Sequence, residues 1–355
     1  MKTVFFLILG VFFGSVFLQA KSYQALTLAG KVVATYEPKE SDHSPKAMVA
    51  SAEAFLNTLG EDEKKQLQLS LDDAERGKWT NVPTKADDGG LRLGDLNEDQ
   101  LEAGCDFLAS VMSEEGYAKA VEVMLADDLL LRSEKQANRR GGLGTANFWF
   151  VIFGKPSVTE PWAIQLDGHH IAFNLTIVGE KVSMSPSFIG TQPHRFTLGG
   201  EEVVPMGEET AAAYAFINSL EEGQKKSAIL SDRRGRIEAG PGRDGVIPKK
   251  RGLSCQTLNE KQKDFLLKLI SLWIDDLPAQ SFQTRLAEVE GQLDETFFFW
   301  QGPHQPGSDA SFHIFGPSLI IEYAGQNLGG DPLNHLHSIY RDPSNEYGAK
   351  WIKKN

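Results

Sequence analysis

The chain has 355 residues, of which 41% are hydrophobic, and it carries a net charge of −12 at pH 7. A chain of this length can bury a large core and usually divides it in two. The acidic balance argues against a nucleic-acid partner, because such a partner needs a basic face to neutralise its phosphates. The expected partner is therefore a small-molecule substrate or ligand.

Residues 1–20 are typical of a secretory signal peptide. Lys2 precedes an apolar run from Val4 to Leu18, and the segment ends in the small residue Ala20. The run is shorter than the roughly 20 apolar residues that cross a bilayer. We therefore expect cleavage after Ala20 and export to the periplasm or the extracellular space, with no membrane span in the mature chain. A retained N-terminal anchor is the alternative.

Export would permit disulfides, but the chain contains only two cysteines, Cys105 and Cys255. Cys105 shares a helical stripe with Leu101 and Leu108, which is typical of a buried thiol. A bridge between the two cysteines is the less favoured alternative. The fold is not expected to depend on it.

Two diverged copies of one unit are predicted to follow an N-terminal extension of residues 21–44. Residues 54–65 recur at 215–226 with seven of twelve positions identical, a shift of 161 residues. Both segments have apolar residues at helical spacing, so each copy should begin with an amphipathic helix. We place the copies at residues 45–200 and 201–355.

A second match lies at nearly the same offset. Asn97 and Gln100 recur as Asn259 and Gln262, a shift of 162 residues. Each pair has the spacing of a capping box, in which the first side chain caps a helix and the third residue on reaches back. Two matches at one offset indicate an internal duplication.

Strand patterns follow the helices in both copies. Aromatic and alternating apolar runs favour strands, and Asp167-Gly168 is a turn signal. The fold class is therefore predicted as α+β: two tandem repeats, each with helices and then a small antiparallel sheet, related by a pseudo-twofold. Residues 231–252, rich in Gly, Pro and basic residues, should form an exposed loop. The predicted strands are 147–153, 162–166, 169–178, 297–300, 312–316 and 318–323.

Histidines cluster in the strand regions, which contain seven of the eight in the chain. His335 and His337 are two residues apart, so on a strand they share a face with Cα atoms about 6 to 7 Å apart. Such a pair can chelate a transition ion if a third ligand arrives, and His169, His170 or Glu322 could supply it. The four histidines are the predicted metal ligands, with zinc expected first and copper or iron second. The alternative is that they bond to the backbone or line a polar groove.

Other polar residues are expected nearby. His170, Asn174 and Glu322 form one candidate constellation, with Asn174 binding substrate. Arg341 continues the row of His335 and His337 and would bind a substrate carboxylate or phosphate bidentately; alternatively it pairs with a neighbouring acid, Asp342 or Glu346.

Two further candidates come from the ends of the copies. His194 occupies the corresponding place in the first copy and should lie near the same site. Tyr347 is a candidate substrate-binding residue.

These motifs resemble a bacterial family catalogued as domain of unknown function 3500. The resemblance rests on motifs distributed over nearly all of the mature chain, and it implies no reaction, cofactor or substrate. It does indicate that the polar residues belong together. The motifs are Arg76 with Trp79 and Pro83, Gly168-His169-His170, residues 186–190 with Pro193, Gly316-Pro317 with Ile321-Glu322, His335-x-His337, Tyr340-Arg341-Asp342 and Tyr347-Gly348.

The predicted function is an exported enzyme with a histidine-rich hydrolytic site between the two repeats, metal-dependent or, alternatively, a metal-free acid–base site. In that reading Glu322 acts as base, His194 assists catalysis and Arg341 holds an anionic group of the substrate. A metalloenzyme with redox chemistry would use the same residue types. A small-ligand-binding protein without turnover is the alternative function, and a purely structural role for the histidines is a third.

Overall fold

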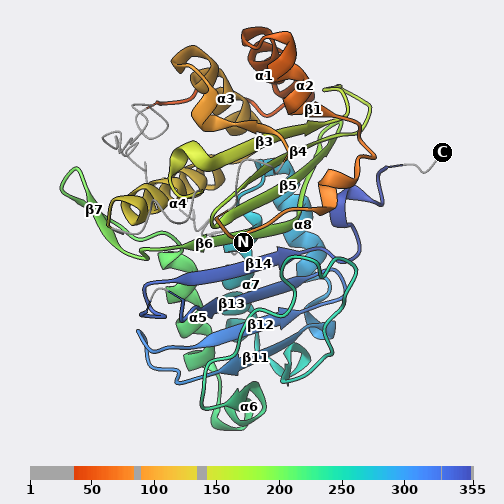
Figure 1. Ribbon diagram of the computed structural model, residues 1–355. Coiled ribbons are helices and arrows are strands. Elements are labelled where there is room, and N and C mark those ends of the chain that lie inside the picture. The colour runs from red at the N-terminus through yellow and green to blue at the C-terminus, as the bar shows by residue number, and fades with distance from the viewer. Residues whose placement is uncertain (1–35, 84–88, 134–141, 329, 353–355) are drawn as a thin grey trace, which may run out of the picture.

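The computed structural model describes residues 36–83, 89–133, 142–328 and 330–352 (Figure 1). The predicted signal peptide lies outside the described residues, as does most of the predicted N-terminal extension. Within the described ranges, no helix has both the length and the apolar character that a bilayer crossing requires.

Eight α-helices occur in the described ranges, in two sets of four. The predicted capping boxes are confirmed: Asn97 accepts a hydrogen bond from the Gln100 amide at 2.9 Å, and Asn259 accepts one from the Gln262 amide at 3.0 Å. The helices are α1 (Pro45–Thr58), α2 (Glu61–Leu67), α3 (Glu98–Val111), α4 (Glu114–Ser133), α5 (Gly207–Ser219), α6 (Glu222–Ala228), α7 (Glu260–Ile274) and α8 (Ala279–Glu290).

Twelve of the described strands form one mixed sheet, and β7 and β8 form a separate hairpin. Two short strands are parallel to their partners, β1 to β3 and β9 to β11, and the other pairs are antiparallel. The strands are β1 (Gln68–Leu69), β2 (Leu91–Arg92), β3 (Phe148–Phe153), β4 (Trp162–Gly168), β5 (Ile171–Val178), β6 (Lys181–Thr191), β7 (Phe196–Leu198), β8 (Glu201–Val203), β9 (Ile229–Ser231), β10 (Leu253–Ser254), β11 (Phe297–Gln301), β12 (Ser311–Phe315), β13 (Ile320–Gly325) and β14 (Leu336–Arg341).

The prediction of small sheets is wrong, because the strands of both chain halves join into one large sheet. The central order is β3-β4-β5-β6-β14-β13-β12-β11. Strands β6 and β14 pair antiparallel, from Leu336 opposite Thr191 to Tyr340 opposite Ser187. Each would otherwise be an edge strand with unpaired backbone groups, and pairing satisfies both edges. We call this β6–β14 contact the seam.

The turn between β4 and β5 is also displaced from its predicted place. Gly168 lies within β4, and the turn consists of His169 and His170, with His170 at φ 71°. Gly168 is needed in the strand for a different reason: a Cβ atom there would lie 2.5 Å from the Phe148 ring. The sequence signal therefore located the hairpin correctly but placed its turn two residues too early.

The two faces of the sheet are covered differently. The helices lie on one face, where they and the sheet bury the main apolar core. A covering loop, residues 232–252, lies on the other, where Ala239 packs with Phe299 and Ile339. In Figure 1 the teal covering loop crosses in front of the strands, and α5, α7 and α8 lie behind them. The stretch predicted as an exposed loop is thus a loop, but it covers the sheet.

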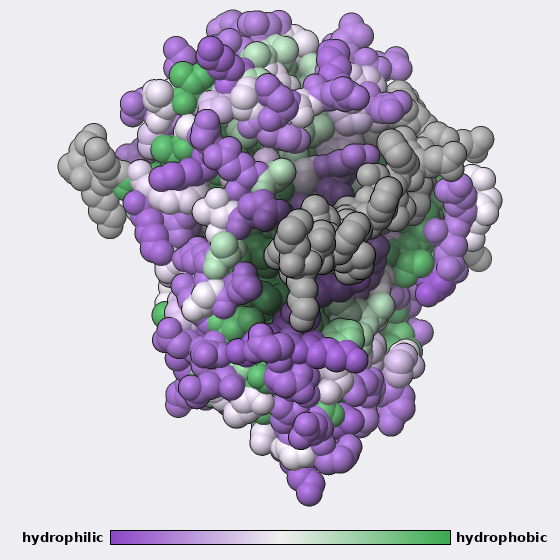
Figure 2. Space-filling model, turned by 180° about the vertical axis from the view of Figure 1, so that it is seen from behind, coloured by the Kyte–Doolittle hydropathy of each residue, from purple (hydrophilic) through white to green (hydrophobic). Residues whose placement is uncertain are grey.

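Figure 2 looks onto the helix face, from behind the view of Figure 1. Hydrophilic residues cover its periphery, and hydrophobic ones are visible in a central hollow.

Both cysteines are buried and free. Burial raises the pKa of each thiol to about 12, so both are protonated at neutral pH.

Candidate metal centre

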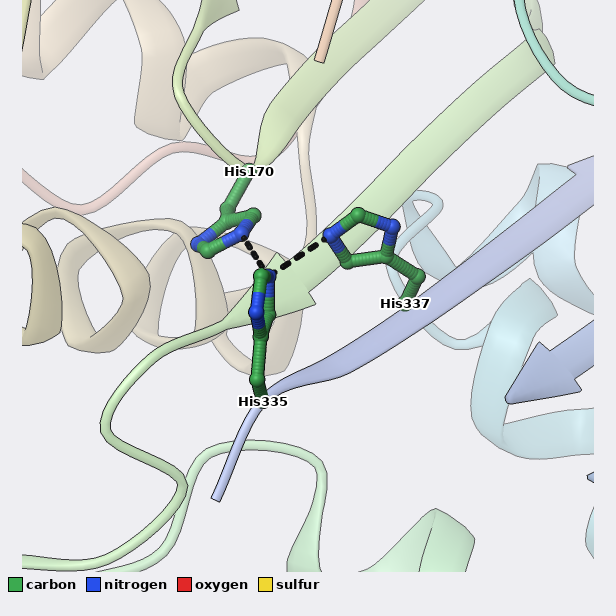
Figure 3. Close-up of side chains that lie close together, drawn as sticks. All are labelled: His170, His335 and His337. Atoms are coloured by element: carbon green, nitrogen blue, oxygen red, sulfur yellow. Dashed lines mark hydrogen bonds between the residues drawn. The ribbon is translucent and has the colours of Figure 1, made fainter. Parts of the chain in front are cut away.

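Three histidines from both halves of the chain converge at one end of the seam (Figure 3). His170 Nε2 lies 2.9 Å from His335 Nε2, which lies 3.0 Å from His337 Nε2. One ring nitrogen from each of these residues falls within 4.8 Å of the others. We call His170, His335 and His337 the triad.

The backbone brings these side chains together through strand register. His337 lies opposite Gly190 of β6, and the Gly190 amide donates to the His170 carbonyl at 2.8 Å. A Cβ atom at Gly190 would lie 3.0 Å from the His170 ring and 3.1 Å from the His337 ring. A glycine at this position therefore leaves space for both imidazoles to approach.

The protonation pattern of the triad suits metal binding. His335 Nδ1 lies 2.5 Å from the Leu328 carbonyl, an acceptor, so Nδ1 carries the proton and Nε2 presents a lone pair to the other two rings. Burial lowers the pKa of His335 and holds the pKa values of His170 and His337 well below their usual range. All three imidazoles are consequently neutral at neutral pH.

Three neutral nitrogens that point at one place match the donor set of zinc, and copper and iron accept the same ligands. Nitrogen ligands lie about 2.0 to 2.1 Å from zinc, and three protein ligands leave a fourth position open. The triad is largely buried, and only His337 is partly exposed. The triad therefore resembles a three-histidine centre with one accessible side, and small rotations of the His170 and His337 rings would bring both nitrogens within the roughly 4.2 Å that two ligands of one zinc ion can span.

His169 is placed beside the triad, but not within it. Its Nδ1 lies 2.5 Å from a carboxylate oxygen of Asp127 in α4, and its ring stacks on His170 with centroids 3.7 Å apart. Three of the four predicted metal ligands thus come together, and the fourth supports one of them. Asp127 is a site residue that sequence reasoning missed, because its only signal is that of an acidic residue within an apolar helical stretch.

Glu322 has partners of its own. Its Oε1 lies 3.1 Å from His313 Nδ1 across β12 and β13, and its Oε2 accepts hydrogen bonds from the amides of Glu238 and Ala239 in the covering loop. The Glu322 carboxylate is fully buried, and it holds the covering loop against the sheet. The hairpin register that pairs it with His313 could have been inferred from the Gly316-Pro317 turn.

Asn174 and Tyr347 also bond elsewhere. Asn174 accepts from Gln165 at 2.7 Å and donates to the Pro186 carbonyl at 2.9 Å. Tyr347 accepts from the Trp79 indole at 3.1 Å and donates to Asp244 at 2.8 Å. His170, Asn174 and Glu322 therefore share one face of the sheet but form no common constellation.

The last two candidates lie at opposite ends of the seam. The His194 amide donates to the carbonyl of Asn334, the residue before His335, while its Nδ1 donates to the Pro205 carbonyl at 3.0 Å. Arg341 is fully buried, with its Nε hydrogen-bonded to Glu346, one of the two acids considered for it. Neither side chain contacts the triad.

Comparison with known proteins yields one match. No curated protein and no solved structure matches the chain. The family model described as "Protein of unknown function (DUF3500)" matches residues 41–349, most of the chain, including all residues of the triad. The chain therefore belongs to this family of proteins of unknown function.

Proposed function

We propose that this protein is an exported metalloenzyme whose triad holds one transition-metal ion, zinc in the first place. The convergence of three neutral histidine nitrogens within 4.8 Å carries this proposal. Buried polar groups normally have partners, and three mutually facing imidazole nitrogens cannot all satisfy one another. A shared cation removes that conflict, because each nitrogen then donates its lone pair to the same centre.

Hydrolysis is the reaction that this centre supports best. Zinc bound by three histidines activates a coordinated water and polarises a substrate oxygen. The Asp127–His169 pair would support the ligand ring of His170, on which His169 stacks. Glu322 faces His313 and the covering loop rather than the triad, so a metal held by the triad would supply the activation of water.

Metal analysis of the purified chain tests this proposal. After expression in metal-replete medium, we expect about one equivalent of transition metal per chain, lost when His170, His335 or His337 is replaced by alanine. His304→Ala is the matched control, because His304 bonds to Asn218 and does not contact the triad. A metal-free wild-type protein that does not take up added zinc would rule out the centre.

A small-ligand-binding protein without turnover is the second candidate. It is favoured by the position of Glu322, which faces His313 and the covering loop and so does not serve the triad as the predicted base. Activity separates the two: a chelator should abolish ester or amide hydrolysis by the enzyme, and zinc should restore it. A protein that binds metal but hydrolyses none of a broad substrate panel would favour the binding function.

We further propose that the two halves arose by duplication and are related by a pseudo-twofold at the seam. The strand pairing supports this proposal, because β3 pairs with β1 in parallel and with β2 in antiparallel orientation, and β11 pairs with β9 and β10 in the same two ways. The side chains of the capping boxes support it as well. Gln100 donates to the Thr58 carbonyl and Gln262 to the Ser219 carbonyl, contacts offset by 162 and 161 residues.

A further inference from the structure

Two buried arginines approach the C-terminal end of the seam, from opposite faces of the sheet. In Arg285 of α8, on the helix face, all three guanidinium nitrogens donate hydrogen bonds. Its Nε donates to the Tyr340 hydroxyl at 2.7 Å, Nη1 donates to Ser318 and Glu288, and Nη2 donates to the Ser318 carbonyl. Arg285 therefore shows how this fold satisfies an arginine for purely structural purposes.

Arg341, on the loop face, is different. Its side chain is 0% exposed, its Nε donates to Glu346, and neither Nη1 nor Nη2 has a partner. A guanidinium does not lose its proton in a protein, so four N–H donors remain unpaired in the interior. Buried donors of this kind are rare in folded proteins unless a ligand, ion or water accepts from them.

We propose that Arg341 forms an anion-binding site, separate from the triad, that takes a carboxylate or phosphate oxyanion on the edge formed by Nη1 and Nη2. That edge presents two parallel N–H groups with the spacing of two oxygens on one carboxylate or phosphate. The Nε side is occupied by Glu346. The free edge can therefore bind the two oxygens of a second anion.

The charge around Arg341 favours an anion. Arg76 lies on the same face, and its partners are the Thr176 hydroxyl and the carbonyls of Leu71 and Tyr347. Burial lowers the pKa of Arg76 to about 10, which still leaves it protonated at neutral pH. Glu346 is shared with the covering loop, since its second oxygen accepts from the Gly245 amide at 2.9 Å. Arg76 is half-buried and Arg341 is fully buried, and Glu346 is the one carboxylate that bonds to either guanidinium among the described residues.

A strained turn follows Glu346, the partner of Arg341. Tyr347 has φ 52° and ψ 26°, a conformation that residues other than glycine seldom adopt. It follows Glu346, and its ring lies 5.8 Å from the Arg76 guanidinium. Backbone strain of this kind is retained where the surrounding structure requires it, often beside a ligand.

The site does not depend on the proposed metal. His337 and Arg341 are four residues apart on β14, which separates their Cα atoms by about 13 Å. Their side chains share a face, but no contact links Arg341 to the triad among the described residues. Anion binding at Arg341 can therefore be tested on metal-free protein.

The test measures thermal unfolding of the chelator-treated chain in acetate, phosphate or chloride at matched ionic strength. A saturable rise in Tm of a few degrees is expected in acetate or phosphate relative to chloride, because a ligand that binds only the folded state stabilises it. Equilibrium dialysis with labelled acetate or phosphate should give one equivalent per chain. The two arms show whether the site prefers a carboxylate or a phosphate.

Variants locate the site. Arg341→Met should abolish the oxyanion-dependent rise, and Arg341→Lys should weaken binding at least tenfold, because an ammonium cannot bind bidentately. Arg285→Met is the matched control: its Tm should fall while the oxyanion-dependent rise remains. His337→Ala should bind the anion as the wild type does, whatever happens to metal content.

Three outcomes would overturn the proposal. One is a wild-type Tm that responds no more to acetate or phosphate than to chloride. Another is an Arg341→Lys chain that binds as tightly as the wild type, which remains informative if Arg341→Met does not fold. The third is loss of anion binding in His337→Ala, which would move the anion to the triad.

Discussion

The two faces of the sheet differ in the charge of the buried polar groups that lack a hydrogen bond. On the helix face, the Trp273 indole donates to Ser338 at 2.7 Å, and every arm of Arg285 has a partner. The helix face also keeps two groups without a hydrogen bond, the Tyr117 hydroxyl and the Trp162 indole, but both are neutral. On the loop face, the fully buried Arg341 is charged, and neither its Nη1 nor its Nη2 forms a hydrogen bond. The loop face thus retains a buried charge that a stable core would have paired or removed.

Neighbouring phenylalanines of β11 offer the largest test of this contrast. Phe298 faces the helices and Phe299 faces the covering loop, and both are 0% exposed. We expect Phe298→Ala to lower the free energy of unfolding by about 3 to 5 kcal/mol, since a rigid cavity remains. Phe299→Ala should cost about 1 to 2 kcal/mol less, because the loop can collapse into the space. Denaturant unfolding measures both, and equal costs would contradict the difference between the faces.

A buried carboxyl group on the helix side, that of Asp128, offers a second test of the comparison. Asp128 of α4 accepts hydrogen bonds from Thr145, yet burial raises its pKa from 3.8 to about 6. Its protonated form is favoured in the folded state, so the contribution of Asp128 to stability is fully present below about pH 4 and is lost as the pH rises through the window from about 4 to 6. The upper limit of this loss is about 3 kcal/mol, from about 1.36 kcal/mol per pKa unit.

Asp128→Asn should flatten the pH dependence of stability in that window. Asparagine keeps an oxygen acceptor for the Thr145 amide and cannot ionise. The measurement is the free energy of unfolding of both proteins at several pH values between 4 and 7. Parallel curves for the two proteins would show that Asp128 does not titrate as described.

The smallest expected effect on stability concerns the triad. Gly190→Ala places a methyl group against the rings of His170 and His337 and 2.7 Å from the Leu336 carbonyl. We expect a loss of about 1 to 3 kcal/mol in stability and a drop of about 10-fold to 100-fold in metal affinity, as for other changes that misplace ligands.

Gly223→Ala is the control, since nothing lies within 4 Å of a Cβ atom there. It should leave metal affinity unchanged and, being in α6, should not destabilise the chain. Unchanged zinc affinity in Gly190→Ala, measured by competition with a chelator, would show that the close approach of the two rings is not needed for binding.

Local signals predicted much of the fold and part of the site. The Asn97–Gln100 and Asn259–Gln262 boxes depend on residues close in sequence, and the structure has them as expected. His335 and His337 also converge, although only His337 lies on β14 and His335 directly precedes the strand. Local signals could not show which of His169 and His170 belongs to the triad. That choice depends on which residue of the turn adopts positive φ, and the displaced turn makes that residue His170.

Long-range pairing accounts for the remaining errors. The seam could not be predicted, because it depends on which strands of two apparently separate sheets are left with free edges. The pairing of Asp127 with His169 joins a helix to a turn 42 residues later. The engagement of Glu322 depends on a loop that has no strand or helix pattern of its own.

The seam has a consequence for the order in which the molecule is completed. β14 is the last strand along the described chain, yet it occupies the middle of the sheet, between β6 and β13. During synthesis, two partial sheets must wait with open edges until this strand emerges, and open edges are templates for aggregation. A chain cut before residue 335 would expose the edges of β6 and β13 and would also lack His335 and His337 of the triad. Metal uptake by the triad would therefore require that the central strand β14 had been synthesised.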